Sequence, residues 1–161
     1  MTNSGKDDVA PDDNVPEGYR LSTTRGPYTS HNGPFYHKTV GNDFWHGVRI
    51  LPRHCNSRGI AHGGMLMTFA DGLLGTCVWR ETGLAGLTMR LTSDFLAPVR
   101  RGEWLEGTAW VIHAKPSAVF CKSHLFIDKR VVLTADAVFR PMVRHKVHKP
   151  VKESAMVEGK T

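Results

Sequence analysis

One carboxylate stands alone in a stretch of sequence that is otherwise suited to burial. Asp71 is the only charged residue between Gly63 and Trp79, and a buried carboxylate is costly unless it has partners. Held in such a place, a carboxylate can act as a nucleophile or as a general base. It can equally lie on the one wet face of a helix, or bond to a neighbouring strand for reasons of folding. The residue types alone leave these possibilities open.

A second group of candidate residues comes directly before this stretch. His62 is followed by Gly63 and Gly64 at the expected start of a helix, where free backbone N–H groups and the helix dipole can stabilise an anion such as a thioester oxyanion. Glycine also allows a substrate to approach the backbone closely. The alternative is a tight turn that only begins the helix. Asn56 can orient a carbonyl group or a water molecule, or it can bond to its own loop.

The spacing keeps these two groups apart. Gly63 and Asp71 are eight residues apart, which corresponds to a rise of about 12 Å along one helix. They therefore cannot act on the same carbonyl carbon within one chain. If both take part in one reaction, a second subunit with its helix alongside must supply one of them, and twofold symmetry then creates two identical composite sites.

The element that must carry these residues is a helix that begins at Gly63 and ends near Gly83. Apolar residues recur at i, i+4 spacing from Met65, and a second apolar row begins at Leu66. Such a helix is apolar nearly all round, so other elements must wrap it. We expect two strands before it, at 35–40 and 43–51, paired as a hairpin.

Four antiparallel strands are expected after the helix, at 87–95, 104–113, 118–127 and 131–140. The first of them alternates strictly and should be half-buried, with one face formed by Leu87, Met89, Leu91, Ser93 and Phe95. One helix inside a long, curved antiparallel sheet is an α+β fold.

The chain has 161 residues, enough for one domain of ordinary size. Hydrophobic residues make up 40% and charged residues 22%, a globular composition that excludes a wholly disordered chain. The net charge of +6 suits an anionic partner such as a phosphate-bearing metabolite, and the absence of a nucleic-acid-binding motif argues against nucleic acid. The predicted domain covers residues 33–141, after a loosely packed arm at 1–32 and before a basic, frayed tail at 142–161. Regular structure should begin near Pro34.

Other features bear on the compartment and on metals. The stretch from Gly63 to Trp79 contains Asp71 and several glycines, which makes it a poor membrane span. The N-terminus lacks the basic start and apolar run of a secretory signal, so we expect a cytoplasmic protein. The three cysteines cannot all pair within one chain, and they are expected to be reduced thiols. His145 and His148 form an HxxH pair without a third ligand, so neither a metal nor a cofactor is expected.

A combination of motifs resembles a known family over roughly residues 33–140. In chain order, the motifs are Asn56, His62-Gly63-Gly64, Asp71, Leu87-Thr88, Phe95-Leu96-Ala97-Pro98 and Gly102-Glu103. Together they resemble the hotdog-fold acyl-CoA thioesterases of the phenylacetic-acid-pathway type. The resemblance implies a helix sheathed by a sheet, protomers that join their sheets as a dimer or as a dimer of dimers, and an active site at the interface between protomers.

The resemblance also implies a role for each candidate residue. Asp71 would be the catalytic carboxylate, Gly63 would supply the N–H of the oxyanion hole, and Asn56 would contact the carbonyl group or the water. Thr88 would place a hydroxyl near the attacking water, and His62 would support the turn.

Contacts to the substrate are expected from Gly64, Lys115 and Ser117. The family usually has a Gly-Arg or Gly-Lys turn near the CoA phosphates, and residues 113–118 depart from that pattern here. Lys115 and Ser117 are still chemically able to bind a phosphate. The turn at Arg100 and Arg101 can also meet these phosphates or simply be solvated.

The sequence therefore predicts an acyl-CoA thioesterase that releases a carboxylic acid and free CoA. One alternative is a hydratase or dehydratase of acyl thioesters, which needs a histidine and an acid placed for proton transfer to carbon. After its first turn, the helix carries Asp71 but no histidine. The other alternative is a non-catalytic acyl-CoA-binding protein. The acyl group itself cannot be deduced from these residues.

Overall fold

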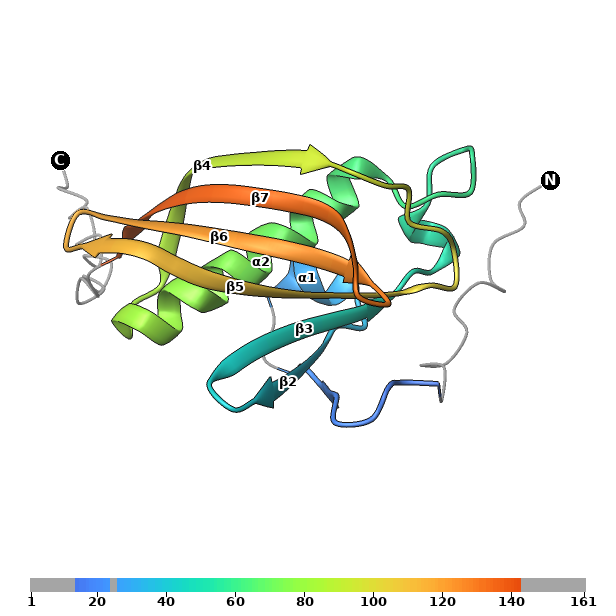
Figure 1. Cartoon of the computed structure of the whole chain (residues 1–161), viewed down its shortest axis with the longest axis horizontal. Helices are drawn as coiled ribbons and strands as arrows, with labels where there is room; N and C mark the ends of the chain where they lie inside the picture. The colour runs from blue at the N-terminus through green and yellow to red at the C-terminus, as the bar shows by residue number, and fades with distance from the viewer. Residues whose placement is uncertain (1–13, 24–25, 143–161) are drawn as a thin grey trace, which may run out of the picture.

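The computed structural model describes residues 14–23 and 26–142 (Figure 1). Its regular elements are, in chain order, β1 (Arg20–Leu21), α1 (Pro27–His31), β2 (Tyr36–Val40), β3 (Asp43–Arg49), a 3-10 turn (Pro52–His54), α2 (Gly63–Thr82), β4 (Gly86–Phe95), β5 (Trp104–Lys115), β6 (Ala118–Ile127) and β7 (Arg130–Pro141). The predicted hairpin, the long helix and the four later strands are all confirmed.

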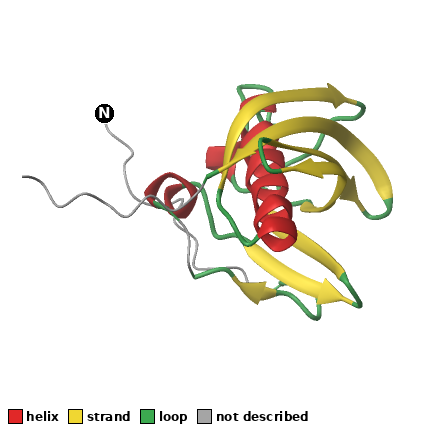
Figure 2. Ribbon diagram, turned by 90° about the vertical axis from the view of Figure 1, so that its left-hand side faces the viewer, coloured by secondary structure: helices red, strands yellow, loops and turns green. Residues whose placement is uncertain are grey.

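The strands form one antiparallel sheet that wraps around α2. Their order across the sheet is β1-β2-β3-β5-β6-β7-β4, so β4 lies at one edge although it follows the helix directly in sequence. Figure 2 shows the sheet curving over one side of the helix. The tight turn between β6 and β7 has positive φ at Asp128 and Lys129, as a two-residue hairpin turn that matches the twist of the strands requires. The architecture is the predicted α+β arrangement.

The helix begins and ends where its sequence provides caps. At the N-terminus, the ring Nδ1 of His62 accepts a hydrogen bond from the Gly64 N–H at 2.9 Å. At the C-terminus, Gly83 has a φ of 69° and its N–H donates to the Trp79 carbonyl oxygen at 2.8 Å, a left-handed ending that glycine allows. These caps fix the length of α2, and with it the separation of the residues along it.

The core lies between α2 and the concave face of the sheet. The helix side chains that are buried there are Leu66, Phe69, Ala70, Leu73, Leu74 and Val78. The helix comes so close to β5 that a Cβ atom at Gly107 would lie 2.9 Å from the Leu73 side chain and 2.5 Å from Leu125. Burial of this face is the main stabilisation of the helix.

The expectation that regular structure begins near Pro34 is wrong. Within the expected arm at 1–32, the structure has a short strand, β1, and a short helix, α1. Tyr19 is 9% exposed, and its hydroxyl donates to the Glu106 carboxylate at 2.6 Å. A segment held by such long-range contacts needs no periodic pattern of its own. The first 13 residues and the tail from residue 143, with the His145–His148 pair, lie outside the described residues.

The expected alternation of β4 is also wrong in one respect. The pairing of β4 with β7 shifts between Thr88 and Arg90, which makes Met89 the extra residue of a β-bulge. Thr88 therefore points to the helix side together with Leu91, which packs on the core. Strict alternation places Thr88 on the other face. As an edge strand, β4 is also more exposed in one chain than the predicted half-buried strand.

Within the described residues, none of the helices combines the length and the apolar character that a membrane crossing requires.

Candidate active site

Asp71, the one charged residue in the apolar stretch of α2 from Gly63 to Trp79, has a close hydrogen-bond partner. The Thr88 hydroxyl donates to Oδ1 of Asp71 at 2.8 Å. This contact exists because the bulge at Met89 turns Thr88 towards the helix, while β4 runs along the helix at the edge of the sheet. Asp71 is partly buried and lines a groove of about 290 Å³. A hydroxyl beside a carboxylate, at a groove that solvent can enter, can position a water molecule for attack.

The helix start leaves one glycine N–H available. The Gly64 N–H is used by the His62 ring, which supports the turn as predicted. Gly63 is the first helical residue, so its N–H has no acceptor within the helix. A Cβ atom at Gly63 would lie 3.3 Å from the Phe95 ring, which is closer than an ordinary contact. The N–H of Gly63, at the positive end of α2, is thus placed to stabilise an anion.

The loop before α2 holds Asn56 close to this helix start. The Asn56 N–H donates to the Ile60 carbonyl oxygen at 2.8 Å, and the Asn56 Oδ1 accepts from the Arg58 N–H at 2.9 Å. The side-chain oxygen therefore bonds to its own loop, one of the two alternatives that the sequence left open. The amide nitrogen still has two N–H donors to offer. Asn56 and Gly63 line the same groove, of about 370 Å³.

The predicted residues thus fall into two places on one chain. Asp71, with Thr88 bonded to it, lines one groove, and Asn56 and Gly63 line another. Both grooves border the same helix, with Gly63 in its first turn and Asp71 two turns further on. That the two groups cannot act on one carbonyl carbon within one chain stays a prediction from their spacing along the helix.

Lys115 and Ser117 lie at the tip of the β5–β6 hairpin, where both are exposed. Figure 1 places this tip at the opposite end of the sheet from the loop that carries Asn56. One chain therefore does not bring them to Gly63. Arg100, in contrast, forms a β-bridge with Ile60, so the Arg100–Arg101 turn lies beside the Asn56 loop.

Two residues at the Asp71 groove were missed by the sequence analysis. Tyr28 and Thr29, from α1, line this groove together with Asp71. They fall in the segment expected to be a loose arm. The local signal for the helix is Pro27, since proline is favoured at the first helical position. A five-residue helix shows no hydrophobic period that could reinforce that signal.

His54 joins α1 to the loop that leads into α2. The ring Nδ1 accepts from the Leu51 N–H at 3.1 Å, so Nε2 carries the proton and donates to the Asn32 carbonyl oxygen at 2.8 Å. The backbone oxygen of the same residue accepts from the His62 N–H at 2.8 Å. Burial of the ring, which is 2% exposed, lowers the pKa of His54 below its usual 6.5, and the charge of Arg53 lowers it further.

We predict that His54 makes stability depend on pH below about 6.5. Because its pKa is lower in the folded chain than in the unfolded chain, its contribution is fully present above the unfolded value and is lost as the pH falls through the folded value. The measurement is the free energy of unfolding by urea at several pH values, for the native protein and for His54→Asn. The difference between the two should shrink as the pH falls, and a constant difference would contradict the prediction.

The cysteine thiols are poor candidates for nucleophiles. All three are free, and burial raises the pKa of Cys77 to about 11 and that of Cys121 to about 12. Burial also raises the pKa of Cys55. Because the thiolate is the reactive form, the raised pKa values make these thiols poor nucleophiles near neutral pH.

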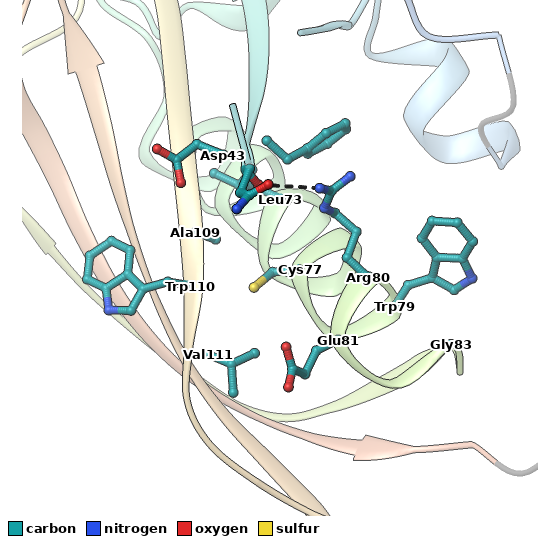
Figure 3. A pocket seen from close by; sticks show the side chains of 12 residues that line it. Asp43, Leu73, Cys77, Trp79, Arg80, Glu81, Gly83, Ala109, Trp110 and Val111 are labelled. Atoms are coloured by element: carbon teal, nitrogen blue, oxygen red, sulfur yellow. Dashed lines mark hydrogen bonds between the residues drawn. The ribbon is translucent and has the colours of Figure 1, made fainter. Parts of the chain in front are cut away.

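A larger cavity, of about 670 Å³, lies on another side of the helix (Figure 3). It opens between the C-terminal half of α2, the β2–β3 turn and β5, with Cys77 and Leu73 at its base and Arg80 at its rim. The Arg80 guanidinium donates to the Asn42 carbonyl oxygen at 3.4 Å. None of the predicted site residues lines this cavity.

Comparisons with known proteins identify the family and the fold. The sequence profile of the thioesterase superfamily matches residues 58–134. A Pseudomonas aeruginosa protein named "Putative esterase PA0474" is 34% identical over 129 residues, a match that covers 78% of this chain and 96% of the relative.

Solved structures show the same hotdog architecture. The PaaI protein of the Escherichia coli phenylacetic acid degradation operon superposes with a TM-score of 0.65 at 19% identity, over 72% of this chain and 85% of PaaI. A hypothetical thioesterase from Streptococcus pneumoniae, solved with coenzyme A, superposes with a TM-score of 0.62 at 19% identity, over 66% of this chain and 87% of the other. The long sheet around one helix is therefore a known fold.

Proposed function

Since the chain belongs to the thioesterase superfamily, we propose that it hydrolyses an acyl-CoA thioester to a carboxylic acid and free CoA. The observation that carries this proposal is the bond between Thr88 and Asp71, a carboxylate with a hydroxyl beside it in a groove. CoA bound to the streptococcal neighbour supports a CoA thioester as the substrate. The chemistry needs water and no cofactor.

Two routes use Asp71. As a general base, its carboxylate takes a proton from water, and the oxygen of that water attacks the thioester carbon. As a nucleophile, the carboxylate attacks the same carbon and forms an anhydride, which water then hydrolyses. In both routes the carbonyl oxygen becomes negative beside the Gly63 N–H, the C–S bond breaks, and the CoA thiolate takes up a proton.

Label in Asp71 after a single turnover in ¹⁸O-labelled water identifies the nucleophile route. In the nucleophile route, water attacks the acyl carbon or the aspartyl carbon of the anhydride, and attack at the aspartyl carbon leaves ¹⁸O in Asp71. In the general-base route all the label goes to the released acid. The label is measured by mass spectrometry of the peptide that contains Asp71, and only attack at the aspartyl carbon places it there.

We further propose that the active site is shared between two chains. Asp71, bonded to Thr88, lines one groove, and Asn56 and Gly63 line the other, so each groove would supply half of a site. The edge strand β4 and the residues after it also expose large apolar side chains, including Met89 (60%) and Leu96 (57%). Exposed apolar groups beside an unpaired strand edge suit pairing with a second copy.

The experiment that tests the function is thiol release from a panel of acyl-CoA esters that varies in chain length and aromaticity. Free CoA is detected with a thiol-reactive dye, and the acid is measured in parallel. Equal amounts of thiol and acid support hydrolysis. Binding of the esters without thiol release would instead indicate a non-catalytic acyl-CoA-binding protein, and release of neither product with hydration of the acyl chain would indicate a hydratase.

A further inference from the structure

The short helix α1 lies against the groove that holds Asp71. Tyr28 and Thr29 line one side of this groove, and Met67, Gly72 and Leu91 line it from α2 and β4. The side chains of Met67 and Leu91 are its apolar part, and the hydroxyl groups of the α1 residues and of Thr68 lie on its walls with the Asp71 carboxylate. An acyl group whose carbonyl carbon lies next to Asp71 would be adjacent to this groove and could bury part of its apolar surface there.

A hydrogen bond holds the Tyr28 side chain in this position. The Thr68 hydroxyl donates its single proton to the Gly64 carbonyl oxygen at 3.0 Å. The Thr68 oxygen must then be the acceptor in its 3.2 Å contact with the Tyr28 hydroxyl, which donates. Tyr28 is 67% exposed, so its position depends on this bond and on the placement of α1 rather than on close packing around the ring.

Two further bonds hold α1 itself in place. The ring of His54 donates to the Asn32 carbonyl oxygen directly after the helix, and the Arg53 guanidinium donates to the Gly33 carbonyl oxygen. The chain then enters the core at Phe35, whose ring lies 5.9 Å from that of Phe69 on α2. The helix that carries Tyr28 is thus tied on its C-terminal side to the same loop and helix that carry the candidate active site.

We propose that Tyr28 is a specificity-determining residue that limits the length of the acyl group. The groove has a volume of about 290 Å³, and the Tyr28 ring is the part of its wall that no surrounding core holds. A short acyl group fits beside Asp71 with the ring in place, and a long one must displace the ring and break its bond to Thr68. This inference rests on the proposed thioesterase activity.

The test compares acetyl-CoA with dodecanoyl-CoA as substrates of the native protein, Tyr28→Ala and Tyr28→Phe. Removal of the ring should raise the ratio of kcat/KM for the long ester over the short one by about tenfold or more, the scale of a changed apolar pocket. Tyr28→Phe keeps the ring and loses only the bond to Thr68, so its ratio should lie between the other two. Because Tyr28 is exposed, both variants should fold, which the unfolding temperature checks.

Trp79→Ala is the matched control, since Trp79 is a similarly exposed aromatic residue, 58% accessible, that lies on α2 and lines the cavity of about 670 Å³ instead of the Asp71 groove. Its ratio should equal that of the native protein. An unchanged ratio in Tyr28→Ala, or an equal change in Trp79→Ala, would overturn the inference. If the native protein releases no thiol from any ester, the proposed function itself fails, so the two failures are distinguishable.

Discussion

Asp71→Asn should leave the fold intact and lower kcat for thioester hydrolysis by about a hundredfold or more. The amide has nearly the same shape and can still accept the hydrogen bond of the Thr88 hydroxyl, which is 2.8 Å from Oδ1 in the native chain. It cannot take a proton from water, and it is a far weaker nucleophile than a carboxylate. The measurement is steady-state thiol release at saturating substrate, with circular dichroism to check the fold.

Two variants act as controls for this result. Asp94→Asn removes an exposed carboxylate from β4, at a position paired with Thr134, and should keep native turnover. Thr88→Ala should cost less than Asp71→Asn, because a second water molecule can partly replace a hydroxyl that positions water. Near-native turnover in a correctly folded Asp71→Asn protein would show that the carboxylate has no catalytic role.

Two inactive variants should restore activity when they share a dimer. If one chain supplies Asn56 and Gly63 and the other supplies Asp71 and Thr88, then a dimer of either single variant is defective at both sites. In a mixed dimer one site collects both defects and the other collects none. Refolding equal amounts of the two variants together should make about half of the dimers mixed, so activity should recover to about a quarter of the native value.

The structure indicates which variant of Asn56 to use. Asn56→Asp keeps an oxygen to accept the Arg58 N–H, so the loop is preserved, and it removes the two side-chain N–H donors. It is refolded with Asp71→Asn, and each variant refolded alone is the control and should stay inactive. If a tag confirms exchange and the mixture is still inactive, the four residues do not form a site between chains.

The sequence alone was sufficient to predict the elements whose buried residues recur with a regular period. The helix at 63–82 and the strand at 118–127 have the predicted bounds because their apolar residues recur at helical or alternating spacing. The short helix α1 and strand β1 have no such pattern. They are held by individual contacts, such as that of Tyr19 with Glu106, which join residues distant in sequence.

Two features of the candidate site, the separation of Gly63 from Asp71 and the contact of Asp71 with Thr88, could be predicted from different kinds of information. The separation of Gly63 from Asp71 followed from helix geometry alone. The pairing of Asp71 with Thr88 did not, because strict alternation turns Thr88 to the opposite face from Leu91, and only the family resemblance suggested it. The bulge at Met89 resolves this conflict. A single extra residue in a strand leaves no mark in a hydrophobic pattern, yet it reverses the face of every residue before it.

The separation of the two grooves along α2 has a consequence for how activity responds to concentration. If the active site is shared between two chains as proposed, a chain has no complete site while it is alone. The number of working sites then follows the dimer population, which falls with the square of the free chain concentration once the protein is diluted below its dissociation constant. Specific activity, which is constant for an enzyme complete in one chain, would decline on dilution. The equilibrium between monomer and dimer would thus set the protein concentration below which thioester hydrolysis slows.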